Sequence, residues 1–313
     1  MNKERVLTVT LNPSLDKTIV LPELRVGSLN RTAGIRLDPG GKGINVARLL
    51  HEFGTGVTAA GWCGGAEGEE LMRYLKRDGI PASFTSAVGA TRTNLKIVDS
   101  SKELTTEINE PGPEVTEAEL AAFIREFRVL LHDVSYLVLG GSIPPGVPPT
   151  VYALLTAIAH EHGVKTVLDA DGEALSEGLQ AVPFAVKPNI HELERLLGRT
   201  LASESEIAGA ARELLGRGVS LVIVSMGESG SLVVGAEEAY RVTPFPITAK
   251  STVGAGDSMV ACLVYCLLQG KTLKEIAAWT SAAGTLTASK EGTQLCTLAE
   301  VQEQVHLVEV HPL

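Results

Sequence analysis

The chain has 313 residues, of which 44% are hydrophobic, enough for one large domain with a sizeable core. Its formal net charge of −10 argues against a nucleic-acid-binding protein, because such proteins carry a basic footprint. The 4 cysteines form no C-x-x-C pair and the histidines no H-E-x-x-H motif, so the sequence predicts no metal site built of Cys and His.

The N-terminal segment and the longest apolar run bear on export and membrane insertion. The first apolar run is short and ends at Asn12-Pro13, and no small-residue cleavage site follows, so we expect no signal peptide. The apolar run Met259–Leu268 is far below the ~20 residues of a membrane-spanning helix. We therefore expect a cytoplasmic protein that binds neither a membrane nor a nucleic acid.

The first part of the chain predicts a buried strand, a small sheet and a glycine-rich turn. Val6–Leu11 is apolar and β-branched, as is typical of a buried strand. Lys17–Val20 and Gly34–Leu37 have polar faces, and we expect them to form a small sheet outside the main core. The glycines of Asp38–Gly43 then open a helix. This turn is not a Walker A loop, because Gly43 replaces the Ser/Thr, and no G-x-G-x-x-G follows a strand.

A strand of alternating polar and apolar residues is predicted from Thr91 to Val98. Its polar face carries Arg92, Asn94 and Lys96, and we expect the segment Glu103–Asn109 to pair with it. Two cations on one side of a strand can form a fork that grips a phosphate group. The alternative is an ordinary solvated strand face, and the pattern alone leaves both open.

Helices and strands alternate through the rest of the chain. The expected helices are 44–53, 67–77, 117–131, 150–162, 192–197, 204–217, 273–288 and 298–305, and the expected strands are 57–62, 136–139, 164–168, 184–187 and 219–224, with a hairpin at 231–234 and 240–242. This alternation indicates a mostly parallel sheet covered on both faces. Open α/β sheets bind ligands where their strands end. Polar residues gather at those strand ends: Ser142, Asp169, Asn189, Glu192 and Ser225.

A second glycine-rich segment, Thr252–Asp257, precedes the apolar run Met259–Leu268, which has helical spacing. The first amides of a helix lack internal partners and lie at the positive end of its dipole, so glycines there let an anion approach. An acid beside them, Asp257, could act as a base toward an attacking hydroxyl, as phosphoryl transfer requires. The alternative is a glycine-rich loop whose first-turn acid is favoured only by the dipole.

Five motifs together carry a family resemblance. GGKGINVA from Gly40, TRTNLK from Thr91, KPNIHE from Lys187, SMGESG from Ser225 and TVGAGD from Thr252 occur in this order. The chain resembles the ribokinase-like, PfkB-type carbohydrate kinases. Many members of that family have Asp at the position of Ser251, and this departure resembles the branch containing 1-phosphofructokinase and tagatose-6-phosphate kinase. The resemblance implies an α/β, ribokinase-like three-layer α/β/α domain over residues 1–313. It also implies a mostly parallel central sheet and a small β-sheet lid from about 12–38 and 90–110.

The resemblance also implies roles for individual residues. The expected catalytic residues are Asp257 as general base, with Gly254, Ala255 and Gly256 holding the phosphoryl charge. The expected sugar-binding residues are Asp16, Gly40, Gly41, Lys42, Asn45, Arg92, Asn94, Lys96 and Ser142. The expected ATP-binding residues are Lys187, Asn189, Ser225, Met226, Gly227, Glu228, Ser229, Gly230, Thr252 and Gly256, and the expected Mg²⁺-associated residues are Glu192 and Asn189.

The resemblance leaves the substrate to be chosen. A plain ribokinase needs no grip on a substrate phosphate, whereas Arg92, Lys96 and Lys42 favour a phosphosugar. We expect ATP-dependent phosphorylation of fructose-1-phosphate, with tagatose-6-phosphate as the alternative and a sugar-phosphate-binding regulator as a reading from another class. In relatives the lids often pair between subunits, so a homodimer joined through the lids is expected.

Overall fold

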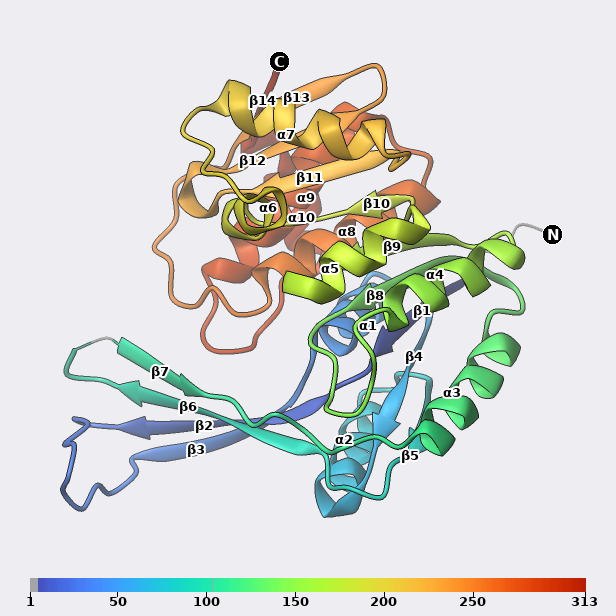
Figure 1. Ribbon diagram of the computed structural model, residues 1–313. Helices are drawn as coiled ribbons and strands as arrows, with labels where there is room; N and C mark the ends of the chain where they lie inside the picture. The colour runs from blue at the N-terminus through green and yellow to red at the C-terminus, as the bar shows by residue number, and fades with distance from the viewer. Residues whose placement is uncertain (1–4, 103) are drawn as a thin grey trace.

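The computed structural model describes residues 5–102 and 104–313. A ten-stranded sheet crosses the molecule in the order β14-β13-β12-β11-β10-β9-β8-β1-β4-β5 (Figure 1). The run from β11 to β5 is parallel throughout, and the pairs from β11 to β14 are antiparallel. These strands are β1 (Arg5–Thr10), β4 (Gly56–Cys63), β5 (Ala82–Ser86), β8 (Val134–Gly140), β9 (Lys165–Asp169), β10 (Ala185–Val186), β11 (Leu221–Ser225), β12 (Ser231–Gly235), β13 (Ala239–Thr243) and β14 (Glu309–Pro312).

Helices cover both faces of this sheet and make two apolar cores. The core on one face contains α1 (Lys42–Glu52), α2 (Gly65–Arg77), α8 (Ala255–Leu268), α9 (Leu273–Ala288) and α10 (Leu298–Gln304). The core on the other face contains α3 (Glu117–Leu130), α4 (Val151–Glu161), α5 (Gly172–Gly178), α6 (Ile190–Leu197) and α7 (Glu204–Gly216). Along β1, Val6 packs into the first core and Leu7 into the second, because successive side chains of a strand point to opposite faces. The expected three-layer α/β/α architecture is confirmed.

A second, four-stranded sheet extends away from the main body, in the order β3-β2-β6-β7 (Figure 1). It is built from β2 (Ser14–Leu21), β3 (Gly34–Gly40), β6 (Arg92–Asp99) and β7 (Leu104–Ile108). β2, β6 and β7 lie within the segments expected to form a lid, about 12–38 and 90–110, and β3 runs two residues past the first of them. The strand expected at Glu103–Asn109 corresponds to β7, except that Glu103 lies outside the described residues.

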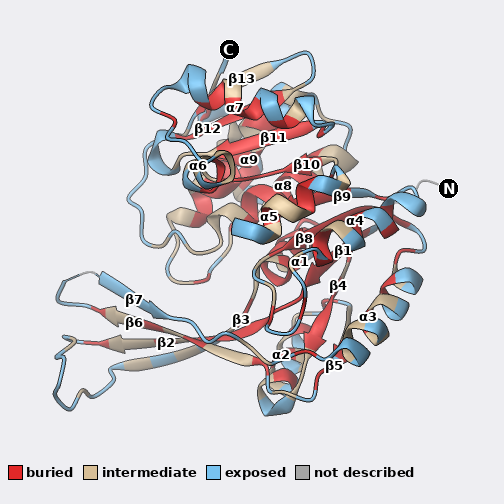
Figure 2. Cartoon of the chain, viewed as in Figure 1, coloured by how far each residue is buried: buried red, intermediate tan, exposed pale blue. Residues whose placement is uncertain are grey.

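The two faces of this small sheet differ in character. Strand register places Asp16 opposite Asn94, and Thr18 opposite Lys96, on one polar face where these side chains are buried. The other face carries Lys17 opposite Leu37 and Leu95 but is otherwise mainly apolar and open to solvent, and we call it the outer lid face. The edge strand β7 is exposed along its length (Figure 2). On the outer lid face, Ile35, Leu37, Leu104 and Ile108 are 57%, 37%, 60% and 51% exposed. The small sheet thus has one buried polar face and one mainly apolar face that is exposed to solvent.

Most expected elements are present, and the departures occur in short ones. β5, α5 and β14 were not expected, and the strand expected at 184–187 is reduced to the two residues of β10. β5 and β14 have few buried side chains, so little apolar periodicity marks them. Within the described ranges, every helix falls short of the length and apolarity needed to span a bilayer.

Candidate active site

The first turn of α8 presents free backbone amides. Gly254 takes a left-handed conformation with φ 79°, which glycine adopts without steric cost, and its carbonyl accepts from the amide of Ser258 at 2.8 Å. Among the described residues, no acceptor bonds the amides of Gly256 and Asp257. Ala255 donates only to the turn carbonyl of Thr252, at 3.3 Å. The positive end of the helix dipole and these amides can together hold a phosphoryl group.

Asp257 joins the two glycine-rich segments. Its Oδ2 accepts a hydrogen bond of 2.8 Å from Nδ2 of Asn45, in the first turn of α1. Burial raises the pKa of Asp257; the Lys42 cation and the Asn45 hydrogen bond act in the opposite direction. A carboxylate with a raised pKa, next to free helix amides, is suited to receive a proton during transfer.

Two lysines share one buried carboxylate beside this helix end. Oδ1 of Asp169, at the carboxyl end of β9, lies 2.9 Å from Nζ of Lys42 and 3.4 Å from Nζ of Lys187. Burial tends to raise the pKa of Asp169, but the two cations lower it. Burial likewise opposes the charge of Lys42, yet the surrounding carboxylates, Asp169 foremost, raise its pKa. A Cβ on Gly256 would lie 3.3 Å from Nζ of Lys187, so this ammonium lies against the start of α8.

This places Lys42 differently from the expectation that grouped it with Arg92 and Lys96. Its neighbours are Asp169, to which it donates a hydrogen bond, and, electrostatically, Asp257 and Glu192. Lys42 follows Gly41 directly at the start of α1, and the backbone there directs its side chain toward β9. The sequence motif located Lys42 along the chain but did not indicate Asp169 as its partner.

Asn189 and Glu192 cap helix α6 reciprocally. The Asn189 side chain accepts from the Glu192 amide at 2.9 Å, and Glu192 Oε2 accepts from the Asn189 amide at 2.8 Å. Such a capping box fixes both side chains at the helix N-terminus. Asn189 also forms a parallel bridge with Ser225, so the cap adjoins the turn after β11.

That turn, Ser225–Gly230, is closed by a hydrogen bond of 2.8 Å from the amide of Met226 to the carbonyl of Gly230. It contains a short 3-10 helix, Gly227–Ser229, in which Glu228 is exposed. Gly227 and Gly230 have positive φ angles of 61° and 87°. The structure thus brings the expected nucleotide-binding turn next to the expected metal-associated pair.

Several of the residues expected to bind the sugar converge on Asp16 of β2. Asp16 Oδ2 accepts from Nζ of Lys96 at 2.7 Å, and Oδ1 accepts from Nδ2 of Asn94 at 3.2 Å and from Oγ of Ser14 at 2.8 Å. A Cβ on Gly40 would lie 2.4 Å from Asp16 Oδ1, so only glycine leaves room for this carboxylate. Lys96 is therefore an ion-pair partner of Asp16.

Arg92 uses other partners. Its Nε and Nη2 donate to the carbonyl of Asn12 at 3.2 and 3.0 Å, and its Nη1 donates to the carbonyl of Glu110 at 3.1 Å. Burial lowers the pKa of Arg92, while Asp16 and Glu110 oppose that shift, and an arginine stays protonated in proteins. Arg92 and Lys96 share the face expected from alternation, but each is held by a different partner, so they do not form one fork.

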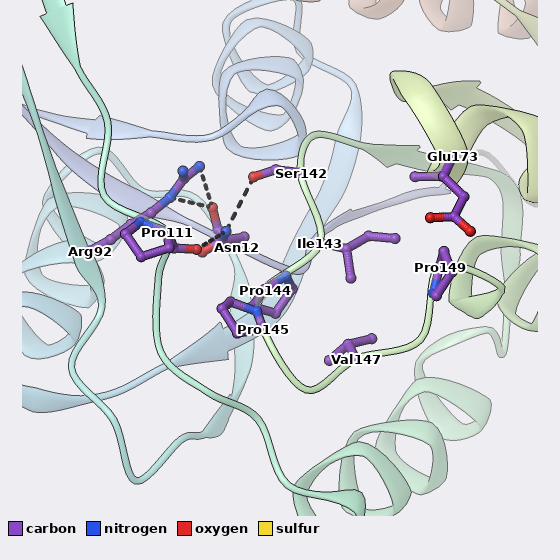
Figure 3. A pocket seen from close by; sticks show the side chains of 11 residues that line it. Asn12, Arg92, Pro111, Ser142, Ile143, Pro144, Pro145, Val147, Pro149 and Glu173 are labelled. Carbon is purple, nitrogen blue, oxygen red and sulfur yellow. Dashed lines mark hydrogen bonds between the residues drawn. The ribbon is translucent and has the colours of Figure 1, made fainter. Parts of the chain in front are cut away.

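Arg92 lines a cleft of about 540 Å³ (Figure 3). Its walls also include Asn12, Pro111 and Ser142 near the guanidinium, and Ile143, Pro144, Pro145, Val147, Pro149, Glu173 and Ala174 farther along. The end of the cleft at Arg92, Asn12 and Ser142 is its polar end, and the other end is apolar except for Glu173 (Figure 3). An anionic group would be favoured at the polar end.

Two residues in this arrangement had no role assigned from sequence. Asp169 was expected at the ligand-binding edge, because it ends a predicted strand, but its link between two lysines was not foreseen. Asn12 was read only as the residue that ends the first strand. The signal available for both was their position at the carboxyl end of a buried strand.

Comparison with known proteins identifies the family. Residues 9–300 match the model of the pfkB family carbohydrate kinases. The 1-phosphofructokinase of Rhodobacter capsulatus is 40% identical over 274 residues, covering 87% of each chain, and that of Xanthomonas campestris pv. campestris is 39% identical over 272 residues, covering 86% of each. The structure of phosphofructokinase-2 from Escherichia coli in complex with potassium matches with a TM-score of 0.92 and 34% identity, covering 97% of this chain and 98% of that one.

The fold and these matches define a phosphotransferase with an alcohol group as acceptor. The chain belongs to the pfkB family of carbohydrate kinases and has its ribokinase-like fold.

Proposed function

We propose that this enzyme transfers the γ-phosphoryl group of ATP to fructose-1-phosphate, forming fructose-1,6-bisphosphate. The observation that carries the mechanism is the 2.8 Å hydrogen bond between Asn45 and Asp257, which joins the first turns of α1 and α8. The substrate is supported by the 40% identity to a relative named 1-phosphofructokinase and by an arginine in a cleft beside the site.

In this mechanism Asp257 accepts the proton of the attacking sugar hydroxyl, a step worth about 10²–10⁴ in rate for a general base. The amides at Gly254, Ala255 and Gly256 offset the negative charge of the migrating phosphoryl group. Lys187 adds a cation on the nucleotide side. Thr252 and the turn Ser225–Gly230 border the ATP site.

On the sugar side, Asp16, held by Lys96 and Asn94, accepts hydrogen bonds from sugar hydroxyls, and Arg92 with Ser142 binds the phosphate arm. Gly40 and Gly41 let the sugar approach the backbone. The small sheet acts as a lid that excludes water, which prevents hydrolysis of ATP.

The donors near Asn189 fit a magnesium ion that keeps most of its water. Among the described residues no group of three or more His, Cys, Asp or Glu could hold a metal. Glu192 spends one carboxylate oxygen on the α6 cap and has the other available. Mg²⁺ dehydrates reluctantly and commonly uses one or two carboxylates with waters and phosphates. When bound, it would neutralise phosphate charge.

An assay of ADP release with fructose-1-phosphate, tagatose-6-phosphate and fructose-6-phosphate tests the proposal. We expect the highest kcat/KM with fructose-1-phosphate. Preference for tagatose-6-phosphate would support the alternative kinase. Binding of phosphosugars without turnover would indicate a regulator, although the geometry around Asp257 argues against that.

We also propose that two copies pair through their outer lid faces. Four large apolar side chains are exposed there, and pairing would remove them from water. A structure titled the tetrameric inhibited form of phosphofructokinase-2 from Escherichia coli matches this chain with a TM-score of 0.90 and 33% identity, so an oligomeric relative shares the fold.

A further inference from the structure

Asn12 lies at the carboxyl end of β1 and connects three segments of the cleft wall. The residue is 3% exposed. Nδ2 donates to the carbonyl of Pro111 at 2.9 Å and to Oγ of Ser142 at 3.2 Å (Figure 3). Its own carbonyl accepts two hydrogen bonds from Arg92. One residue therefore fixes the positions of the arginine, the serine and the β7–α3 connection relative to one another.

The guanidinium of Arg92 is oriented entirely by backbone carbonyls. Three of its donor contacts go to Asn12 and Glu110, and a guanidinium has five N–H donors. The remaining donors belong to the two terminal nitrogens, whose planar fork matches the geometry of a phosphate group. Ser142 Oγ, which accepts from Asn12, keeps its own hydroxyl proton to donate.

The side-chain amide oxygen of Asn12 lowers the stability of the fold, which a residue with a purely structural role would not be expected to do. Oδ1 is buried and bonds no donor among the described residues. It packs against Gly112, where a Cβ would lie 2.2 Å away and where φ is 92°. Burying an unpaired polar atom costs free energy, and such departures occur where function requires a particular geometry. Here the required geometry is that of the two hydrogen bonds that Nδ2 donates to Pro111 and Ser142.

We propose that Asn12 is a positioning residue for the phosphate arm of the substrate, holding the Ser142 hydroxyl and the Arg92 fork on one side of the cleft. The inference rests on the proposed function, because it assigns the phosphate of that sugar to the polar end of the cleft. Asn12 acts through Arg92 and Ser142 and does not take part in the proton transfer at Asp257.

The test compares Asn12→Ala and Asn12→Asp with the control Asn30→Ala. Asn30 also donates to backbone carbonyls, those of Arg25 and Ser28, but it lies in the β2–β3 connection. We expect Asn12→Ala to raise KM for fructose-1-phosphate about tenfold, the loss that one hydrogen bond to a charged network commonly causes, with kcat and KM for ATP within threefold. Asn12→Asp should raise KM for fructose-1-phosphate further, since a carboxylate repels the phosphate. Asn30→Ala should match the unmodified protein.

A second measurement separates this inference from the proposed function. Inorganic phosphate should raise the Tm of the unmodified protein and protect Asn12→Ala less, whether or not any sugar is turned over. If the unmodified enzyme phosphorylates no phosphosugar, the proposed function fails, while the phosphate experiment still judges Asn12. The inference is overturned if folded Asn12→Ala keeps an unchanged KM for the sugar and unchanged phosphate protection. A rise in both KM values together with a lower Tm would indicate a structural role and overturn it as well.

Discussion

At the scale of single residues, the proposed mechanism makes transfer depend on Asp257. Asp257→Asn keeps the shape and can still meet Asn45, but it cannot accept the sugar proton. We expect kcat to fall by about 10²–10⁴ while the Kd for ATP stays within threefold. The control is Asp78→Asn, at the C-terminal end of α2 and ion-paired to Arg77. Activity of Asp257→Asn within tenfold of the unmodified enzyme would show that another group is the base.

The same carboxylate predicts a pH dependence. A base works in its deprotonated form, so kcat should fall as pH drops through the pKa of Asp257, which burial raises above 3.8. The nearby Lys42 cation opposes this shift. Lys42→Met should therefore raise the pKa of Asp257 further and move the acidic limb of the kcat profile to higher pH. A limb that stays in place or moves to lower pH would contradict the assignment; Lys76→Met, on the exposed side of α2, is the control.

At the scale of elements, the sequence predicted those with strong apolar periodicity. The helix 273–288 was placed with the observed bounds of α9, and the structure shows that a capping box at Thr272 fixes its start. β10, with two residues, and β5, at the sheet edge, have too little periodicity to be placed in this way.

In the candidate site, the sequence predicted which residues take part but not which residues they contact. Motifs located Asp257, Lys42 and Arg92 along the chain, and strand ends indicated where they would gather. Their partners were not predictable, because the ion pairs of Lys42 with Asp169 and of Lys96 with Asp16 join residues 127 and 80 positions apart. Such pairings depend on strand order and side-chain direction, which local pattern does not encode.

The junction between β3 and α1 gives a test of element packing. Gly40→Ala would place a Cβ 2.4 Å from both Asp16 Oδ1 and Ser14 Oγ and displace the sugar-side carboxylate. We expect KM for fructose-1-phosphate to rise at least tenfold, with a smaller change in KM for ATP. Gly34→Ala is the matched control at the other end of β3, where a Cβ meets nothing within 4 Å. Similar kinetics for the two variants would mean that Asp16 is not held as the structure indicates.

At the scale of the whole molecule, the two sheets divide the work. The large sheet carries Asp169, Lys187 and the turn Ser225–Gly230 at its strand ends, and the polar face of the small sheet carries Asp16 and Arg92. Only the polar face of the small sheet serves this site. The outer lid face contributes nothing to it and still exposes several large apolar side chains, so its composition calls for a different explanation.

Pairing of two outer lid faces supplies that explanation and predicts a measurable change. Ile35→Asp with Ile108→Asp puts a charge on each edge strand of the face, where two copies would bring like charges together. We expect light scattering to show a dimer for the unmodified protein and a monomer for the double variant. Val26→Asp is the control, because Val26 is 92% exposed in the β2–β3 connection and outside the face. A monomeric unmodified protein, or a dimer that survives both charges, would rule out this interface. If the monomeric variant also binds the sugar more weakly, pairing of the two small sheets also stabilises the sugar-binding residues that they carry.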